Sequence, residues 1–204
     1  MIKRLGIFGG AFDPVHKGHT LSLKFVNDLK IVDEVHVIPN FASPHDKNIQ
    51  SAGSHRLKML EMAFNEFENI KINEFELNNK NKSYTYETLN SYKQVYPDRH
   101  FSLIIGQDSL HNFATWKNWE GILSLCSLLV LGRTLNQNKK LDRALESRIT
   151  LDIDDFFSDH GKIFLLKNDF VNVSSSEIRK KIKNDENLTG LLDQNVQEYI
   201  QNMS

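Results

Sequence analysis

Residues 5–19 read LGIFGGAFDPVHKGH, and this stretch decides the fold. An apolar run, Leu5 to Phe8, is followed by two glycines and then by two histidines near the start of the next predicted helix. A strand that leads through glycines into a helix lets the backbone approach an anion closely, and the helix start offers N–H groups and a positive dipole end. Imidazoles add hydrogen-bond donors where negative charge gathers. The stretch therefore predicts a phosphate site and favours a nucleotide as ligand.

The competing interpretation is an ordinary glycine-rich turn between a strand and a helix. Such a turn explains Gly9 and Gly10. It does not explain His16 and His19 at this spacing after an Asp-Pro pair. The block GGxFDPxHxGH resembles the signature of the nucleotidyltransferases of the HxGH superfamily, which are relatives of the class I aminoacyl-tRNA synthetases. The resemblance implies that ATP is bound by Gly9, Gly10, Phe12, His16 and His19, and that the two histidines are catalytic.

Composition is typical of a compact globular domain. A chain of 204 residues fits one domain with a sizeable core, and a formal net charge of −1 argues against binding of long nucleic acids, whose affinity depends on phosphate neutralisation. The only cysteine, Cys126, lies in an apolar run, so we expect a buried small hydrophobe rather than a disulfide or a catalytic thiol. No signal peptide and no apolar stretch of membrane-spanning length is evident, so we expect no membrane partner and a cytoplasmic protein.

Short β-type runs alternate with amphipathic helical stretches along the chain. This alternation predicts an α/β fold, a Rossmann-like doubly wound parallel sheet with helices on both faces, in a single domain over 1–204. In such sheets ligands bind beyond the carboxyl ends of the strands, where we expect Gly9, Gly106 and Gly132 to come together. The predicted strands are 5–8, 34–38, 70–72, 101–105, 128–131 and 163–166, and the predicted helices are 21–29, 55–67, 86–95, 119–123 and 177–183. The stretch 134–159 is the hardest to interpret and is predicted to be a mobile insert.

Further segments narrow the resemblance to the bacterial nicotinate-nucleotide adenylyltransferases, which join nicotinic acid mononucleotide to the AMP part of ATP. Residues 38–47 read IPNFASPHDK and resemble the family's IPxxxPPHK segment, with Ser43 in place of the first proline. The resemblance implies substrate contacts for Asn40, His45 and Lys47, with a catalytic part for Lys47; a solvated polar loop is the alternative. Arg56 matches an arginine of the next helix in the family, although an exposed helical arginine would look the same.

Two segments in the middle of the chain resemble the part of the family that binds the pyridine nucleotide. Residues 83–89 read SYTYETL and resemble the SYTxxTL element, in which Tyr84, Thr85 and backbone amides face the nicotinate carboxylate. Thr85 is also placed to cap a helix. Residues 104–116 resemble IIGxDxLxxFxxW, which implies ATP contacts for Gly106 and Asp108, a substrate contact for Asp108 as well, and stacking on the pyridine ring for Trp116. The same comparison assigns Lys117 to the substrate site, whereas Trp119 is expected in the core.

The segment VSSSEIR at 173–179 resembles the family's ISSTxIR motif. Serines at a helix start expose N–H groups and hydroxyls, and an arginine one turn later can reach a triphosphate. The resemblance therefore implies ATP contacts for Ser174, Ser175, Ser176 and Arg179, with Arg179 catalytic; a plain capped helix is the alternative. Residues 185–204 resemble the closing C-terminal helix of the family.

Taken together, the resemblance implies adenylyl transfer from ATP to nicotinic acid mononucleotide in NAD biosynthesis, by direct in-line attack without a covalent enzyme intermediate. Mg²⁺ is expected to come with ATP, and no metal site of the protein's own is predicted. Pantetheine-phosphate adenylyltransferase shares a related first motif, but that family usually has threonine at the position of His16. A nucleotide-binding regulator without catalysis is the alternative from another class. The sequence leaves open the strictness of nicotinate over nicotinamide recognition and whether the chain forms a homo-oligomer.

Overall fold

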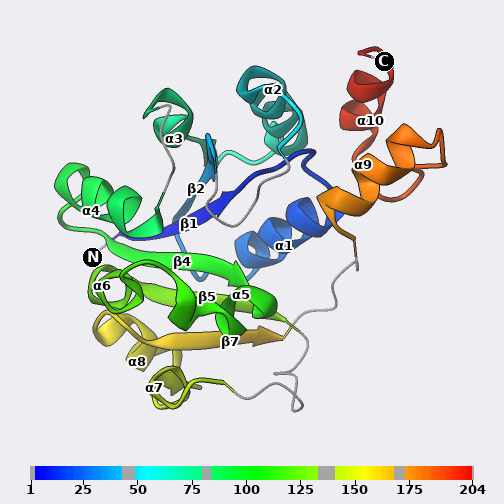
Figure 1. The fold of residues 1–204 in the computed structure, drawn as a ribbon. Helices are drawn as coiled ribbons and strands as arrows, with labels where there is room; N and C mark the ends of the chain where they lie inside the picture. The colour runs from blue at the N-terminus through cyan, green and yellow to red at the C-terminus, as the bar shows by residue number, and fades with distance from the viewer. Residues whose placement is uncertain (1–2, 43–48, 80–83, 133–140, 168–172, 204) are drawn as a thin grey trace. The chain divides into compact units, whose positions relative to one another are not determined.

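Seven strands form one sheet in the computed structural model, which describes residues 3–42, 49–79, 84–132, 141–167 and 173–203. The strand order is β3-β2-β1-β4-β5-β7-β6 (Figure 1). The strands are β1 (Arg4–Gly10), β2 (Glu34–Pro39), β3 (Ile70–Ile72), β4 (His100–Gly106), β5 (Ser127–Gly132), β6 (Ile149–Thr150) and β7 (Ile163–Lys167).

The strands pair in parallel wherever the register is defined, between β1 and β4, β4 and β5, β5 and β7, and β6 and β7. Successive strands β2 and β3 are added on one side of β1, and β4, β5 and β7 on the other, which is the doubly wound order. Parallel strands covered on both faces are continuously apolar, as β5 shows: residues 128–131 are at most 2% exposed. The predicted α/β, Rossmann-like fold is confirmed.

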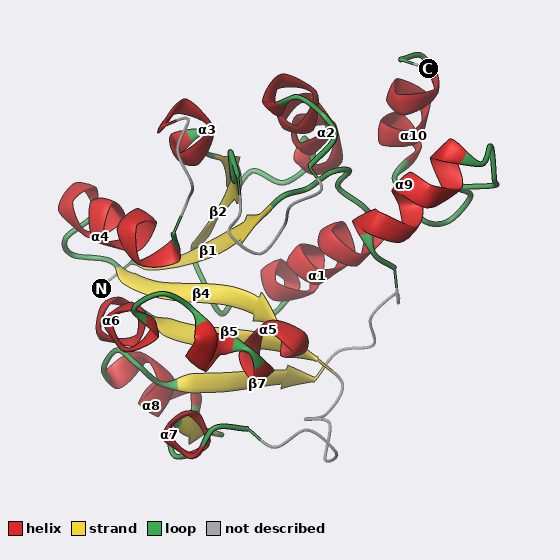
Figure 2. Cartoon of the chain, viewed as in Figure 1, coloured by secondary structure: helices red, strands yellow, loops and turns green. Residues whose placement is uncertain are grey.

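Helices occupy the connections between strands (Figure 2). All five predicted helices are present, and so is a closing helix, although α10 is shorter than the predicted 185–204. The periodicity did not reveal α3, α5, α7, α8 or the 3-10 helix η1, because none is longer than six residues. The helices are α1 (Lys17–Asp28), α2 (Gly53–Phe64), α3 (Phe75–Asn79), α4 (Thr85–Val95), α5 (Gln107–His111), η1 (Phe113–Thr115), α6 (Trp119–Leu125), α7 (Arg143–Glu146), α8 (Ile153–Ser158), α9 (Ser175–Lys183) and α10 (Gln194–Gln201).

Helices α7 and α8 and strand β6 lie within 134–159, the stretch predicted to be a mobile insert. The carboxylate of Asp142 accepts a hydrogen bond from the Ala144 N–H at 2.8 Å and so caps α7. Asp152 accepts from the Asp154 N–H at 2.7 Å and caps α8. Acidic residues here serve as N-caps and first-turn charges, which stabilise short helices.

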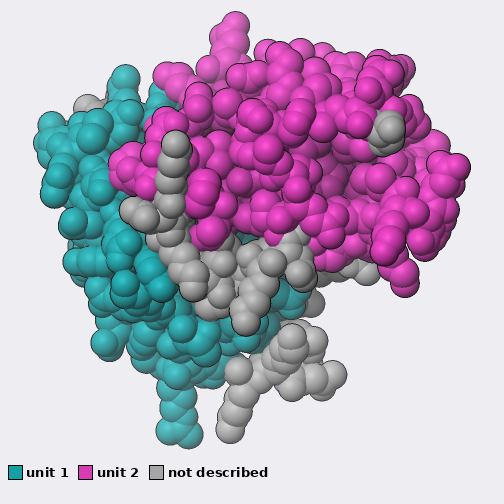
Figure 3. Space-filling view, turned by 45° about the horizontal axis from the view of Figure 1, so that its top comes forward, with its two compact units in different colours: residues 1–8, 31–36, 83–169 teal, residues 9–30, 37–82, 170–204 magenta. Residues whose placement is uncertain are grey.

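The chain divides into two compact units, each built from separate segments of sequence (Figure 3). Unit 1 comprises Met1–Phe8, Ile31–His36 and Ser83–Asp169, and unit 2 comprises Gly9–Lys30, Val37–Lys82 and Phe170–Ser204. The core of unit 1 contains Leu5, Ile104, Leu128 and Ile163, each at most 1% exposed. The core of unit 2 contains Leu23, Val37, Leu60 and Val196, all 0% exposed.

Cys126 is fully buried at the end of α6. Burial raises the pKa of its thiol to about 12, so the thiol stays protonated near neutral pH and is a poor nucleophile. The predicted structural role is confirmed. Among the helices in the described part of the chain, none is both long enough and apolar enough to cross a bilayer.

Candidate active site

Two histidines lie at the start of α1 in unit 2. His16 is the N-cap residue of this helix and is only 6% exposed. Its ring stacks on that of His19, with centroids 3.7 Å apart and planes inclined by 22°. The ring of Phe12 packs edge-on against His19, with centroids 5.0 Å apart. The spacing of the HxGH block thus folds both imidazoles into one cluster.

Glycine is required between these histidines because the ring of His16 covers the backbone of Gly18. A Cβ at Gly18 would lie 2.9 Å from Nδ1 and 3.0 Å from Cε1 of His16. The ring of Phe12 covers Gly10 similarly, where a Cβ would lie 3.1 Å from Cζ. Phe12 itself has a φ of +49°, in the left-handed region that residues other than glycine rarely adopt. Such strain is concentrated at functional sites.

Both histidines are neutral near pH 7. Burial lowers the pKa of His16 to about 4. Burial and, to a smaller extent, repulsion from His16 lower the pKa of His19 well below its usual range. The backbone N–H of His16 donates to Nδ1 of His19 at 3.2 Å, so neutral His19 carries its proton on Nε2. The ring is therefore fixed as a donor through Nε2.

The backbone at the start of α1 offers less to a ligand than the sequence alone suggests. The N–H of Lys17 already donates to the carbonyl of Leu191 at 2.9 Å, and that of His16 is used by His19. The side chain of His16 is different, because its buried Nδ1 has no hydrogen-bond partner among the described residues. Buried Oδ1 of Asn40 also has no hydrogen-bond partner among the described residues, while the Asn40 N–H donates to the carbonyl of Gly10 at 2.9 Å. Buried polar atoms of this kind are expected to meet a ligand or water.

Helix α9, which begins within the VSSSEIR segment at Ser175, packs its first turn onto the histidine motif. Ser174 is the N-cap of α9, and its Oγ accepts from the Glu177 N–H at 3.2 Å. Ser175 Oγ donates to the carbonyl of Pro14 at 2.9 Å. The guanidinium of Arg179 donates to the carbonyl of Asp13 at 2.6 Å and to Ser176 Oγ at 3.2 Å. The structure thus brings two of the predicted motifs together within unit 2.

Two buried charged residues were not among the predicted site residues: Asp13, within the GGxFDPxHxGH block, and Arg56, which contacts that block. Arg56 is 1% exposed and donates to the carbonyl of Ala11 at 2.7 Å, which excludes the exposed helical arginine that the sequence left open. Asp13 is also 1% exposed and accepts from the N–H groups of Gln50 at 2.6 Å and Ser51 at 3.2 Å. The available signal for Arg56 was its match to an arginine of the family, and for Asp13 it was its place in the GGxFDPxHxGH block; burial itself gave no signal in advance, because buried charges are rare unless they are paired.

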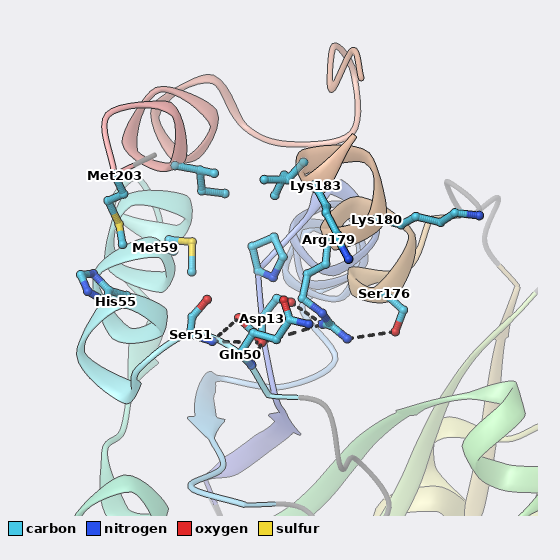
Figure 4. Close-up of a pocket in the computed structure, with 13 residues that line it drawn as sticks. Asp13, Gln50, Ser51, His55, Met59, Ser176, Arg179, Lys180, Lys183 and Met203 are labelled. Carbon is cyan, nitrogen blue, oxygen red and sulfur yellow. Dashed lines mark hydrogen bonds and ion pairs between the residues drawn. The ribbon is translucent and has the colours of Figure 1, made fainter. Parts of the chain in front are cut away.

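A cavity of about 700 Å³ lies among α2, α9 and α10 in unit 2 (Figure 4). Figure 4 shows Arg179 reaching from α9 toward Asp13, with Gln50 and Ser51 on the other side of the carboxylate. Neither histidine of the motif lines this cavity. Its walls combine apolar and basic side chains, including Met59, Ile182, Ile200, Arg179, Lys180 and Lys183.

Unit 1 carries the residues predicted to bind the pyridine nucleotide. Lys117 Nζ lies 3.9 Å from the centroid of the Tyr84 ring and 3.0 Å from a carboxylate oxygen of Glu87. Thr85 begins α4 as predicted, but Tyr84 is the N-cap residue and no side chain caps the helix. The first turn of α4 and Lys117 are therefore neighbours in space.

The remaining predicted residues of unit 1 follow β4. Gly106 ends the strand and is the N-cap of α5, which carries Asp108 in its first turn. The half-buried ring of Trp116 lies 5.1 Å from that of fully buried Phe113. Trp119 is half-buried as well, so the prediction that it belongs to the core is wrong; it is the first residue of α6, where one side of the helix meets solvent.

Some predicted positions have no structural description. His45 and Lys47 lie outside the described residues, as does 133–140, most of which belongs to the predicted insert. Among the residues that are described, no group of three or more His, Cys, Asp or Glu side chains is arranged to hold a metal ion.

The sequence is similar to a known family of nucleotidyltransferases over most of its length. Residues 7–181 match the model of the cytidylyltransferase-like family, and the chain belongs to that family. Within it, the chain belongs to the nicotinate-nucleotide adenylyltransferases. It is 33% identical over 199 residues to a protein of Fusobacterium nucleatum named "Probable nicotinate-nucleotide adenylyltransferase", with 97% of each chain covered. A protein of the same name from Pseudoalteromonas atlantica is 34% identical, with 97% of this chain and 92% of that protein covered.

Solved structures support the fold. The Plasmodium falciparum nicotinic acid mononucleotide adenylyltransferase complexed with NaAD superposes with a TM-score of 0.76 at 22% identity, covering 98% of this chain and 96% of that chain. The same enzyme complexed with APC gives a TM-score of 0.74. These likenesses establish the architecture, and the full-length similarity to the bacterial proteins establishes the family.

Proposed function

We propose that this protein transfers the adenylyl group of ATP to nicotinic acid mononucleotide, forming nicotinic acid adenine dinucleotide and pyrophosphate for NAD biosynthesis. The observation that carries the proposal is the pair of stacked, neutral histidines at the start of α1, in a chain related over its full length to nicotinate-nucleotide adenylyltransferases. Buried His16 stacks on His19 at the start of the same helix, where a phosphate is attracted by the positive end of the helix dipole.

The chemistry is a single displacement. A 5′-phosphate oxygen of nicotinic acid mononucleotide attacks the α-phosphorus of ATP, and the bond from that phosphorus to the bridging oxygen of the β-phosphate breaks, so that pyrophosphate leaves with the electron pair. The attacking phosphate is already ionised, and no general base is needed. Catalysis then consists of positioning and charge stabilisation. Holding the two reactants in line can supply ~7–11 kcal/mol of barrier reduction.

The residues of unit 2 would serve the triphosphate. His19, fixed as an Nε2 donor, and His16 donate to phosphate oxygens as charge moves toward the leaving group. Arg179 and Lys47 contribute positive charge to the remaining phosphates. We assign Gly9, Gly10, Phe12 and the hydroxyl groups of Ser174, Ser175 and Ser176 to contacts with ATP.

The residues of unit 1 would serve the nicotinic acid mononucleotide. The amides at the start of α4 and the ammonium of Lys117 face a carboxylate favourably, because a helix N-terminus and a cation both attract negative charge. We assign pyridine stacking to Trp116, contacts with both ATP and the substrate to Asp108, and an ATP contact to Gly106. Asn40 and His45, in unit 2, complete the substrate contacts. A preference for nicotinate over nicotinamide belongs to the same proposal: a ligand carboxylate would accept from the N–H groups at the start of α4 and would compete with Glu87 for Lys117.

Mg²⁺ belongs to this proposal as a companion of ATP. When bound, it neutralises charge on the triphosphate. The buried carboxylate next to Arg179, Asp13, already accepts two backbone N–H groups and is therefore not free to bind the ion. The described residues thus fit an ion that arrives bound to ATP. The phosphates of ATP, rather than a cluster of protein carboxylates, would hold the ion.

The test is pyrophosphate release by the purified protein with ATP and Mg²⁺, comparing nicotinic acid mononucleotide, nicotinamide mononucleotide and phosphopantetheine. We expect release with the nicotinic acid form and much slower release with the other two. Release only with phosphopantetheine would overturn the substrate, equal rates with both pyridine nucleotides would overturn the preference, and no release would overturn the enzymatic function. A His19→Ala sample purified in parallel controls for contaminating enzymes.

A further inference from the structure

Asp13 joins three segments of unit 2 that are far apart in sequence. Its carboxylate accepts from the N–H of Gln50 at 2.6 Å and from that of Ser51 at 3.2 Å. Its carbonyl accepts from Nη1 of Arg179 at 2.6 Å, and the same nitrogen lies 3.9 Å from Oδ2. The residue therefore ties the histidine motif both to the segment that leads into α2 and to the first turns of α9 (Figure 4).

The carboxylate of Asp13 is buried, so it needs compensating partners and attracts the guanidinium of Arg179. The side chain is 1% exposed, whereas that of Arg179 is 12% exposed. An ionised carboxylate in such surroundings is stable only when hydrogen bonds and a counter-charge compensate its loss of water. The backbone N–H groups of Gln50 and Ser51 supply the hydrogen bonds, and Arg179 supplies the counter-charge. In return, the guanidinium is attracted to one side of the motif and is held there with little freedom.

The guanidinium is held at two points by different atoms. Nη1 meets the carbonyl of Asp13, and Nη2 meets Ser176 Oγ at 3.2 Å. A planar group anchored by two nitrogens has a fixed orientation, unlike an ammonium on a flexible chain. Its remaining N–H bonds then point in a set direction before any ligand arrives.

We propose that Asp13 is a positioning residue for the triphosphate, acting through Arg179. Its carboxylate and carbonyl set the orientation of the guanidinium and so reduce the ordering that ATP binding would otherwise require. This proposal rests on the proposed function, because it assumes that Arg179 faces ATP. A purely structural part for Asp13, as the acceptor that holds residues 50–51, is the competing explanation.

A double-mutant cycle separates the two explanations. ATP binding is measured by calorimetry, without turnover, for the wild type, Asp13→Asn, Arg179→Gln and the double variant. Asparagine keeps the shape of the side chain but removes its charge. We expect Asp13→Asn to weaken ATP binding roughly ten- to a hundredfold, because the guanidinium loses the buried counter-charge 3.9 Å from Nη1 and keeps only its hydrogen bond to the Asp13 carbonyl. In the Arg179→Gln background the same change is expected to have little further effect.

Steady-state kinetics provide a second readout. If Asp13 acts through Arg179, the KM for ATP rises in Asp13→Asn while the KM for nicotinic acid mononucleotide stays near that of the wild type. General loosening of unit 2 would not select one substrate. Asp33→Asn is the matched control, because Asp33 also accepts a backbone N–H, from Arg4 at 2.7 Å, but lies in unit 1 and is exposed.

The proposal is overturned if Asp13→Asn binds ATP normally, or if it weakens binding by the same factor with and without Arg179. Should Asp13→Asn fail to fold, Arg179→Lys takes its place, since lysine keeps the charge but not the two-point anchor. Wild-type ATP affinity in Arg179→Lys would also refute the proposal. Failure of this proposal is distinguishable from failure of the proposed function, which is tested by pyrophosphate release from the wild-type enzyme with each of the three substrates.

Discussion

Substitution of Gly18 by alanine tests whether the ring position of His16 matters for turnover. The new Cβ would lie 2.9 Å from Nδ1 and 3.0 Å from Cε1 of His16, and 3.2 Å from Cγ1 of Val173. His16 is 6% exposed, so the ring has little space into which it can move. Overpacking of this kind costs ~1–3 kcal/mol. Alanine in place of glycine within a helix returns roughly 0.5–1 kcal/mol. We therefore expect stability to fall by only about 1 kcal/mol.

Turnover is expected to change far more than stability. Displacing a catalytic group by about 1 Å can cost on the order of a hundredfold in rate. The assay is pyrophosphate release at saturating ATP and nicotinic acid mononucleotide, with urea unfolding of the same samples. Leu21→Ala, at a position of the same helix that is 44% exposed, is the control and should retain wild-type turnover. The added Cβ must displace the His16 ring. Normal turnover in a folded Gly18→Ala enzyme would therefore refute the reasoning, because it would show that turnover does not depend on the position of this ring.

Four further predictions concern ionisable side chains. His19→Ala should fold normally but turn over about a hundredfold more slowly or worse, measured by pyrophosphate release; a rate close to wild type would remove the residue from the mechanism. Because burial lowers the pKa of His16 to about 4, its imidazole should stay neutral as the pH falls through 6.5 and gain a proton only toward 4; an NMR titration of the His16 ring in the substrate-free protein with a midpoint near 6.5 would contradict this. Burial lowers the pKa of His100, so the unfolded chain binds a proton near pH 6.5 that the folded protein does not. Stability should therefore be complete above pH 6.5 and fall below it, and His100→Gln should reduce that fall in urea titrations at several pH values. Cys126, with its thiol pKa raised to about 12, should react with a thiol reagent at pH 8 only in denaturant.

Much of the architecture was predictable because its signals are local. Strands covered on both faces are continuous apolar runs, and each of the six predicted runs is a strand in the structure. The motif GGxFDPxHxGH predicts a cluster of two imidazoles because residues three apart in a helix share a face. Helices of six residues or fewer escaped, since periodicity needs several repeats before it can be recognised. Thr85 shows a finer limit: its helix was predicted, but the N-cap is Tyr84.

What the sequence by itself determined is the α/β fold, the order of its motifs and the residue types that we propose meet phosphate. Tertiary structure alone decided how those residues are held. Asp13 meets Gln50 across 37 positions and Arg179 across 166, and Arg56 reaches Ala11 across 45. No periodicity or spacing records such contacts, because they depend on how distant segments pack. The same packing buries His16 and lowers its pKa, which turns a histidine of ordinary basicity into a neutral hydrogen-bonding group at physiological pH.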